Sequence, residues 1–296
     1  MSPSGVRILA PAKVNLHLAV GALRSDGYHD VVTILQSIGL HDTVTLRPAP
    51  TFSFACTPGI GIPVEQNLAY RAARLCSERY GRDLDVSISV EKRIPAGAGL
   101  GGASADAAAV ISGLARMWSR TIADPVALEV ARSLGADVPF FLEGGAALFV
   151  GRGDVLERRL TALDASIVLV KPAGPVPTVA AYRAFDLIFP APPSPPAADD
   201  LAAALDSGDT AAVATDLYNN MTEAAIAVLP DVGRALDLVR SADGVLGATV
   251  AGSGSSVFGI CDSRAAAEAV ADLARDAGLW AEATSTLRDG CVIETL

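Results

Sequence analysis

Cysteine and histidine are scarce in this chain of 296 residues. The four cysteines are scattered and never stand in C-x-x-C spacing, and the three histidines include no H-E-x-x-H pair. Disulfide frameworks need many paired cysteines and zinc sites need closely spaced ligands, so the sequence argues against both. We therefore expect reduced thiols and no metal site built from these residues.

Positive charge and long apolar runs are also in short supply. The 23 basic residues are outnumbered by 33 acidic ones, which gives a net charge of −10. Such a chain lacks the basic face that binding to nucleic acid requires. No apolar run approaches the ~18 residues that cross a membrane, and the N-terminus lacks the pattern of a signal peptide. We expect a cytoplasmic monomer or homodimer whose partners include neither nucleic acid nor membrane.

Lysine is also scarce. Of the 23 basic residues, only Lys13, Lys92 and Lys171 are lysines, and all the others are arginines. An ammonium group is a compact charge on a flexible stem, which the planar guanidinium group of arginine does not supply. A lysine kept against this preference is therefore a candidate site residue, with chance as the alternative for any one of the three.

The apolar pattern predicts alternating strands and helices in the first half of the chain. Alternation with a period of two predicts strands at residues 6–21 (interrupted by Pro11), 42–49, 52–57 and 85–93. Helical spacing predicts helices at residues 67–80, 104–118 and 124–134. Gly81 is a typical helix end and Asp124 a typical N-cap.

The second half opens with a buried strand at residues 165–172, and proline-rich residues 190–200 predict a surface loop. Further elements are predicted in the order helix 231–241, strand 247–254, strand 255–262, helix 263–278 and strand 279–287. This order is typical of a ferredoxin-like α+β unit, with helices on one face of an antiparallel sheet.

A glycine-rich loop separates the predicted strand at 85–93 from the helix that follows. Gly97, Gly99 and Gly102 satisfy G-x-G-x-x-G, so a dinucleotide-binding oxidoreductase is one alternative. The context differs, because the loop begins several residues after the strand and the next helix leads into a second helix. The Walker A motif and the protein-kinase motifs H-R-D and D-F-G are absent.

Backbone N–H groups converge where a glycine run enters a helix, at the positive end of the helix dipole. We predict that this loop wraps a polyphosphate, with a tight turn that binds nothing as the alternative. Ser104 could cap the helix, contact phosphate or offer its hydroxyl to Mg²⁺. Asp106 is interpreted as a carboxylate at the helix start.

Four segments in order resemble the signature blocks of the GHMP small-molecule kinases. They are "APAKVNLHL" near the start, "PAGAGLGGASAD" in the glycine loop, "LGADVPFFL" in the middle and "VAGSGSSVFGI" near the end. "PAKVNL" combined with "DGYH" resembles the branch that uses ATP to phosphorylate the 2-hydroxyl of a cytidine-diphosphate-linked methylerythritol in the non-mevalonate isoprenoid pathway. Galactokinases and homoserine kinases have different N-terminal blocks. Another GHMP kinase with a different alcohol acceptor, an oxidoreductase and a non-catalytic sensor stay open as alternatives.

The resemblance implies an α+β chain with the two-domain GHMP kinase fold and the active site between the domains. Residues 1–162 would form an N-terminal α/β domain like that of ribosomal protein S5. Residues 163–296 would form the ferredoxin-like C-terminal domain.

The resemblance also assigns roles to individual residues. Lys13 and Asp137 match the catalytic pair, in which the carboxylate accepts the proton of the hydroxyl and the ammonium group stabilises the nascent alkoxide. The substrate side would be formed by Asn15, Tyr28, His29, Thr178 and Tyr182. The residues implied for ATP are Asn67, Pro95, Ala96, Gly97, Ala98, Gly99, Leu100, Gly101, Gly102, Ala103, Ser104 and Ala105.

Some site features have weaker support. Lys92 and Lys171 each end a strand and either help to hold a diphosphate or lie in solvent. The loop at residues 251–256 is expected to close the site through backbone amides, with a plain hairpin turn as the alternative. ATP would arrive with Mg²⁺, but no carboxylate matches the magnesium-binding glutamate of some GHMP kinases, so no protein ligand is assigned to the metal.

Overall fold

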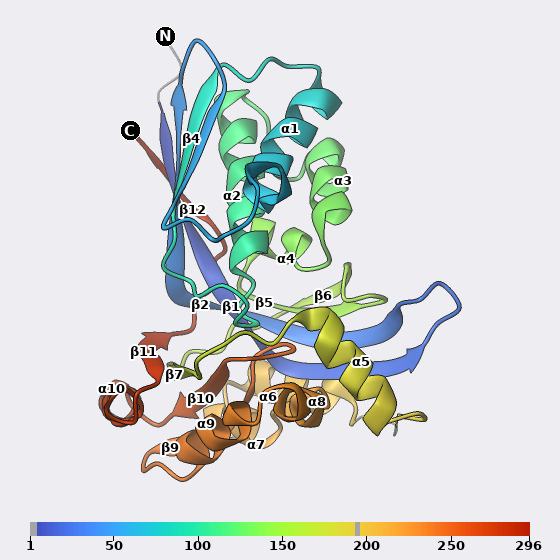
Figure 1. Ribbon diagram of the computed structural model, residues 1–296, viewed down its shortest axis with the longest axis vertical. Helices are drawn as coiled ribbons and strands as arrows, with labels where there is room; N and C mark the ends of the chain where they lie inside the picture. The colour runs from blue at the N-terminus through green and yellow to red at the C-terminus, as the bar shows by residue number, and fades with distance from the viewer. Residues whose placement is uncertain (1–4, 193–195) are drawn as a thin grey trace.

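Two long antiparallel strands, β1 (Val6–Leu23) and β2 (His29–Pro48), form a hairpin that extends through both halves of the molecule (Figure 1). The computed structural model describes residues 5–192 and 196–296. The predicted interruption at Pro11 is wrong, because β1 continues through this residue. The register shifts between Pro11 and Ala12, and such a bulge accommodates a residue that has no N–H to donate.

The hairpin is the centre of an eight-stranded sheet. On one side, β12 and β8 pair with β1; on the other, β4 and β5 pair with β2 and continue to β3 and β6. The added strands are β3 (Ser53–Thr57), β4 (Val86–Glu91), β5 (Ala146–Val150), β6 (Val155–Leu160), β8 (Tyr218–Asn219) and β12 (Val292–Thr295).

Helices cover one face of this sheet (Figure 1). They are α1 (Leu68–Tyr80), which follows the short 3₁₀ helix η1 (Val64–Gln66), then α2 (Gly102–Met117), α3 (Pro125–Leu134) and α4 (Val138–Glu143). α2 is buried over most of its surface, because its many alanines allow close packing against β1 and β2. This packing fixes the N-terminus of α2 at the cleft between the two sheets.

The predicted helix ends are confirmed by the capping geometry. The side chain of Asp124 accepts a hydrogen bond from the N–H of Val126 at 2.9 Å, and α3 begins at the next residue. α1 ends at Gly81, whose φ of 59° is the left-handed conformation that glycine adopts at helix ends.

The second sheet has four antiparallel strands in the order β11–β7–β10–β9. They are β7 (Ser166–Lys171), β9 (Val245–Val250), β10 (Val257–Cys261) and β11 (Trp280–Ser285). With α9 (Asp231–Arg240) and α10 (Arg264–Asp276) on one face, this arrangement confirms the ferredoxin-like prediction. The opposite face packs Ile167 and Phe258 against Ile34 and Ile38 of β2, so it is buried as well.

Four further helices lie between β7 and α9: α5 (Thr178–Ile188), α6 (Ala198–Ser207), α7 (Thr210–Thr215) and α8 (Thr222–Val228). The prediction of a loop at residues 190–200 is wrong for its last residues. α6 begins at Ala198 and has Asp199 and Asp200 in its first turn. Carboxylates in this position favour a helix start through the helix dipole. Residues 193–195 of that loop lie outside the described part of the chain.

The division at residue 162 stays a prediction. β7 begins at Ser166, shortly after it, but β8 and β12 from the second half of the chain pair with β1 in the first sheet. No helix within residues 5–192 and 196–296 is both long and apolar enough to cross a membrane.

Candidate active site

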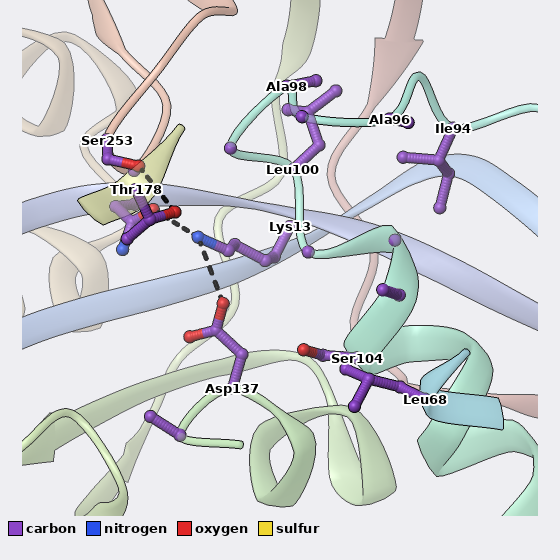
Figure 2. A pocket seen from close by; sticks show the side chains of 18 of the residues that line it. Lys13, Leu68, Ile94, Ala96, Ala98, Leu100, Ser104, Asp137, Thr178 and Ser253 are labelled. Atoms are coloured by element: carbon purple, nitrogen blue, oxygen red, sulfur yellow. Dashed lines mark hydrogen bonds and ion pairs between the residues drawn. The ribbon is translucent and has the colours of Figure 1, made fainter. Parts of the chain in front are cut away.

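A cavity of about 480 Å³ lies between the two sheets. Its walls come from the glycine loop and the start of α2, from residues on β1 and β2, from α5 and from the turn between β9 and β10. Figure 2 shows this cavity from close by, with Lys13 beneath the glycine loop and Asp137 facing it. The signature blocks, which are far apart in the sequence, therefore meet in one place.

Lys13 and Asp137 form an ion pair inside the cavity. Nζ of Lys13 lies 3.6 Å from Oδ2 of Asp137 (Figure 2). The same Nζ donates a hydrogen bond of 2.7 Å to Oδ1 of Asn15. Asp137 occupies the N-cap position of α4 but makes no side-chain cap hydrogen bond, so its carboxylate is directed at Lys13 instead.

The glycine loop is held tightly by the protein itself. The backbone N–H of Lys13 donates to the carbonyl of Leu100 at 3.0 Å, which ties the loop to β1. A Cβ atom on Gly99 would lie 2.0 Å from the carbonyl oxygen of Ala251, and one on Gly101 would lie 2.6 Å from Cζ of Phe141. Both glycines have φ near 77°, at 78° and 76°. These glycines are therefore required by packing, in addition to any role in phosphate binding.

Most residues predicted to bind ATP line the cavity. Every residue from Pro95 to Ser104 does so, whereas Ala105 is fully buried in α2 and does not. The first N–H groups of α2, from Gly102 onward, have no partner within the helix and sit at its positive end. Asn67 also lines the cavity, but its Oδ1 accepts from the N–H of Ala69 and caps α1. This capping role of Asn67 was not predicted from the sequence.

The predicted substrate residues divide into two groups. Asn15, Thr178 and Tyr182 line the cavity, and burial together with the nearby Asp137 raises the pKa of Tyr182 to about 12. Tyr28 and His29 do not line it. His29 is buried beside the cavity, with its ring centroid 5.2 Å from that of Tyr182.

Tyr28 and His29 are anchored by other contacts. The Nε2 atom of His29 lies 3.3 Å from Oδ1 of Asp186 on α5, which links the hairpin to this helix. Tyr28 is 54% exposed, and the guanidinium carbon of Arg152 lies 4.8 Å from the centre of its ring. Both residues lie near the tip of the β1–β2 hairpin, at the margin of the cavity.

Lys92 does not lie in solvent. Its side chain is 8% exposed and its Nζ contacts both Asp42 and Asp106, the latter at 2.6 Å. Asp42 also accepts hydrogen bonds from the N–H groups of Arg93 and Ile94. The interpretation of Lys92 as a solvated strand end is therefore wrong, because a buried ammonium group requires partners of opposite charge.

Asp106 lies in the second turn of α2, and its main partner is Lys92, so its interpretation as a helix-start carboxylate is also wrong. Burial raises the pKa of Asp106 to about 8, with Asp42 adding to the effect and Lys92 opposing it. Burial alone would lower the pKa of Lys92, but the two carboxylates outweigh it and raise that pKa. Two carboxylates thus share one ammonium group beneath the glycine loop.

Lys171 lies outside the cavity lining. Its Nζ donates to the carbonyl oxygens of Pro172 and Gly174, at 3.2 and 3.1 Å, and burial lowers its pKa. The turn at residues 251–256 contacts the glycine loop, because the N–H of Ser256 donates to the carbonyl of Ala98 at 3.1 Å. Gly252 and Ser253 of this turn line the cavity. That its amides bind a ligand stays a prediction.

Sequence reasoning missed several residues of the cavity. Thr33 accepts from Nδ2 of Asn15 at 2.9 Å and donates to the carbonyl of His17, so it orients Asn15. Arg152 and Gly153, in the segment "GRGD", also line the cavity. A basic residue between two glycines was the available signal for Arg152. The strand pattern contained no signal that pointed to Thr33.

The chain belongs to the GHMP kinase family, as two family models together show. The model described as "GHMP kinases N terminal domain" matches residues 67–145, and "GHMP kinases C terminal" matches residues 201–278. This finding confirms the resemblance and the two-domain fold. It also disfavours the oxidoreductase alternative, in agreement with the connection from α2 to α3, since the helix of a dinucleotide-binding βαβ unit leads into a parallel strand.

Two relatives are similar over most of their length. A protein of Nocardioides sp. named 4-diphosphocytidyl-2-C-methyl-D-erythritol kinase is 40% identical over 86% of this chain and 88% of its own. A protein of the same name from Gloeobacter violaceus is 38% identical over 98% of this chain and 97% of its own. A solved structure of 4-(cytidine 5′-diphospho)-2C-methyl-D-erythritol kinase matches with a TM-score of 0.80 at 35% identity, covering 95% of this chain and 98% of that one.

Proposed function

We propose that this protein transfers the γ-phosphoryl group of ATP to the 2-hydroxyl of 4-(cytidine 5′-diphospho)-2-C-methyl-D-erythritol, a step of the non-mevalonate isoprenoid pathway. The observation that carries the proposal is the Lys13–Asp137 pair, 3.6 Å apart in a cavity bounded by the glycine loop. The names of the relatives support the choice of acceptor. The amide-rich loop and the carboxylate together supply what phosphoryl transfer to an alcohol needs.

The reaction requires the acceptor hydroxyl to lose its proton as its oxygen bonds to the γ-phosphorus. Asp137 accepts that proton, while the bond from the γ-phosphorus to the bridging oxygen breaks and ADP leaves. The Lys13 ammonium group stabilises the developing negative charge on the acceptor oxygen. Asn15, fixed by Thr33 and bonded to Lys13, holds this ammonium group in place. The N–H groups at the start of α2 bind the phosphates of ATP.

The acceptor's base lies against aromatic rings beyond the hydroxyl. Tyr182 lines the cavity and has His29 beside it, so a base stacked on Tyr182 would also reach the His29 ring. Stacking of a base on an aromatic ring contributes ~1–3 kcal/mol. Thr178, whose Oγ1 lies 3.4 Å from Oγ of Ser253, offers a hydroxyl at the boundary between α5 and the β9–β10 turn (Figure 2).

Magnesium is expected to enter with ATP. Among the described residues there is no group of three or more His, Cys, Asp or Glu side chains able to hold a metal ion. Mg²⁺ in kinases is often bound by substrate phosphates, water and one or two carboxylates, so this cavity fits an ion that ATP itself brings. Bound there, Mg²⁺ would neutralise charge on the transferred phosphoryl group.

ADP release measured over a panel of alcohols tests the proposal. We expect turnover of the cytidyl acceptor and none of mevalonate or homoserine. Turnover of either of these without turnover of the cytidyl compound would make the protein a different GHMP kinase. Protection against thermal unfolding by NAD(P) but not by ATP would point to an oxidoreductase or a sensor.

Asp137→Asn tests the mechanism. We expect kcat to fall by about 10²- to 10⁴-fold, the usual contribution of a general base. ATP binding, measured by calorimetry, should stay near that of the wild type because the side chain of Asp137 pairs with Lys13 and the proposed phosphate donors are the N–H groups at the start of α2. Asp243→Asn, at an exposed position outside the cavity, is the matched control. An unchanged kcat in Asp137→Asn would exclude Asp137 as the base.

A further inference from the structure

Arg152 occupies a fixed position beside the acceptor half of the cavity. It lies in the loop between β5 and β6, between Gly151 and Gly153, which have φ of 73° and 83°. The N–H of Val31 donates to the carbonyl of Gly151 at 2.7 Å, and Val31 and Arg152 form a β-bridge. The loop is therefore attached to β2, and Arg152 lines the cavity together with Val31 and Thr33.

Two neighbours orient the guanidinium group of Arg152. Its Nη2 donates to Oδ2 of Asp154 at 2.8 Å, while its backbone N–H donates to Oδ1 of the same carboxylate at 3.2 Å. The guanidinium carbon lies over the ring of Tyr28, 4.8 Å from the centre of the ring. The Arg152 side chain is still 44% exposed, against 14% for Asp154. Asp154 thus holds Nη2 of Arg152, while much of the Arg152 side chain stays accessible to solvent.

The other cations of the cavity are already engaged. Among the residues that line it, the basic ones are Lys13, Lys92 and Arg152. Lys13 contacts Asn15 and Asp137, and Lys92 is buried between two carboxylates. A chain with a net charge of −10 needs a local positive group to bind an anionic acceptor. Arg152 is the basic side chain of this cavity with donors open to solvent.

The spacing along β2 places Arg152 between the two ends of the acceptor. Alternate residues of a strand face the same side, and His29, Val31 and Thr33 are all buried. His29 lies beside Tyr182, at the expected position of the base, and Thr33 contacts Asn15 next to the catalytic pair. These two ends are roughly 13 Å apart along the strand, at ~3.3 Å per residue. Val31, which bridges to Arg152, is midway.

We propose that Arg152 is a specificity-determining residue that binds the diphosphate of the acceptor, with Asp154 and Tyr28 positioning its guanidinium group. The inference rests on the proposed function, because a diphosphate must link the base to the reacting alcohol. A guanidinium fork can make two parallel hydrogen bonds to phosphate oxygens. Arg152 contributes to acceptor affinity and has no part in the transfer step.

Steady-state kinetics of Arg152→Gln and Arg152→Lys test the proposal. For Arg152→Gln we expect KM for the acceptor to rise about 10- to 100-fold, the range for a lost hydrogen bond to a charged group. The kcat at saturation and KM for ATP should change less than about twofold. Arg152→Lys keeps the positive charge but not the forked arrangement of donors, so its KM for the acceptor should lie between those of the wild type and Arg152→Gln. Arg158→Gln, on exposed β6 and paired with Asp199, should match the wild type.

Calorimetry with CDP and with cytidine, each in the presence of a saturating non-hydrolysable ATP analogue, isolates the diphosphate. We expect Arg152→Gln to lose affinity for CDP and to keep that for cytidine. Equal CDP binding by variant and wild type overturns the role of Arg152 and leaves the proposed function intact. Equal loss of CDP and cytidine binding also overturns it, since Arg152 would then only support Tyr28. A wild-type protein that binds neither compound and does not turn over the cytidyl acceptor refutes the proposed function itself.

Discussion

Asp106→Asn should change the pH dependence of stability, because two buried carboxylates share the ammonium group of Lys92. Asp42 accepts hydrogen bonds from two backbone N–H groups as well as from Lys92. Oδ1 of Asp106 has no hydrogen-bond partner among the described residues. Asp106 is therefore the carboxyl group that retains a proton, in agreement with its pKa of about 8.

The sign and size of the effect follow from this raised pKa. An unfolded aspartate has a pKa near ~3.9, so between about pH 4 and pH 8 the folded protein binds a proton at Asp106 that the unfolded chain has released. The stability that Asp106 contributes is fully present below the unfolded pKa and is lost as pH rises through the folded one. The loss is about 1.4 kcal/mol per pH unit. Asparagine resembles the protonated side chain in shape, still accepts from Lys92 and does not titrate.

Calorimetric melting of both proteins at pH 5, 6 and 7 measures this difference. From pH 5 to pH 7 the free energy of unfolding of the variant should rise by about 2.7 kcal/mol relative to that of the wild type. At ~2 °C per kcal/mol, its Tm should rise by about 5 °C relative to the wild type. Asp276→Asn, exposed on α10, should follow the wild type. A Tm difference that stays constant across these pH values, or that changes in the opposite direction, would refute the shared proton.

Two further substitutions probe the cavity walls. Gly99→Ala should weaken ATP binding at least tenfold in a fluorescence titration and should lower Tm. The reason is that the new Cβ atom would lie 2.0 Å from the carbonyl oxygen of Ala251. Gly59→Ala is the control, because a Cβ atom there would meet no other atom within 4 Å. Normal ATP affinity in Gly99→Ala would show that the loop adapts at no cost. Tyr182→Ala should raise KM for the acceptor by about 5- to 100-fold, because the variant has no ring for the base to stack on. In Tyr182→Phe, KM for the acceptor should stay within about threefold of the wild-type value, since stacking needs only the ring. If both variants raise this KM equally, the role belongs to the hydroxyl of Tyr182 instead.

The elements that could be predicted from sequence are those that local patterns determine. α3 has an N-cap and a proline at its start, and α1 ends at a glycine, so their limits follow from residues within one turn. The ferredoxin-like order of the five elements from α9 to β11 could also be predicted, because each is an uninterrupted periodic segment. β12 could not, since its four residues form a strand only by pairing with β1 from the opposite end of the chain.

The same distinction applies to the site. Lys13, Asp137 and the glycine loop, which the structure brings together in one cavity, could be singled out because they lie in recognisable motifs. The partners of Lys92 were not, because Asp42 is 50 residues away and reaches it only after β2 and β4 pair. Thr33 likewise enters the cavity through strand pairing, which leaves no local pattern. Arg152 is attached to β2 by a β-bridge, and its two flanking glycines were the only local signal for it.

β1 does contain one sequence signal for the acceptor side. Its residues at even positions, such as Val14 and Leu16, pack in the apolar core between the two sheets. The alternate residues Lys13, Asn15 and His17 are polar, yet each is at most 4% exposed. In an ordinary antiparallel strand the polar face meets water, so a polar face that is buried must meet other polar groups or a ligand. Here the first two of these side chains line the cavity, where Lys13 faces Asp137.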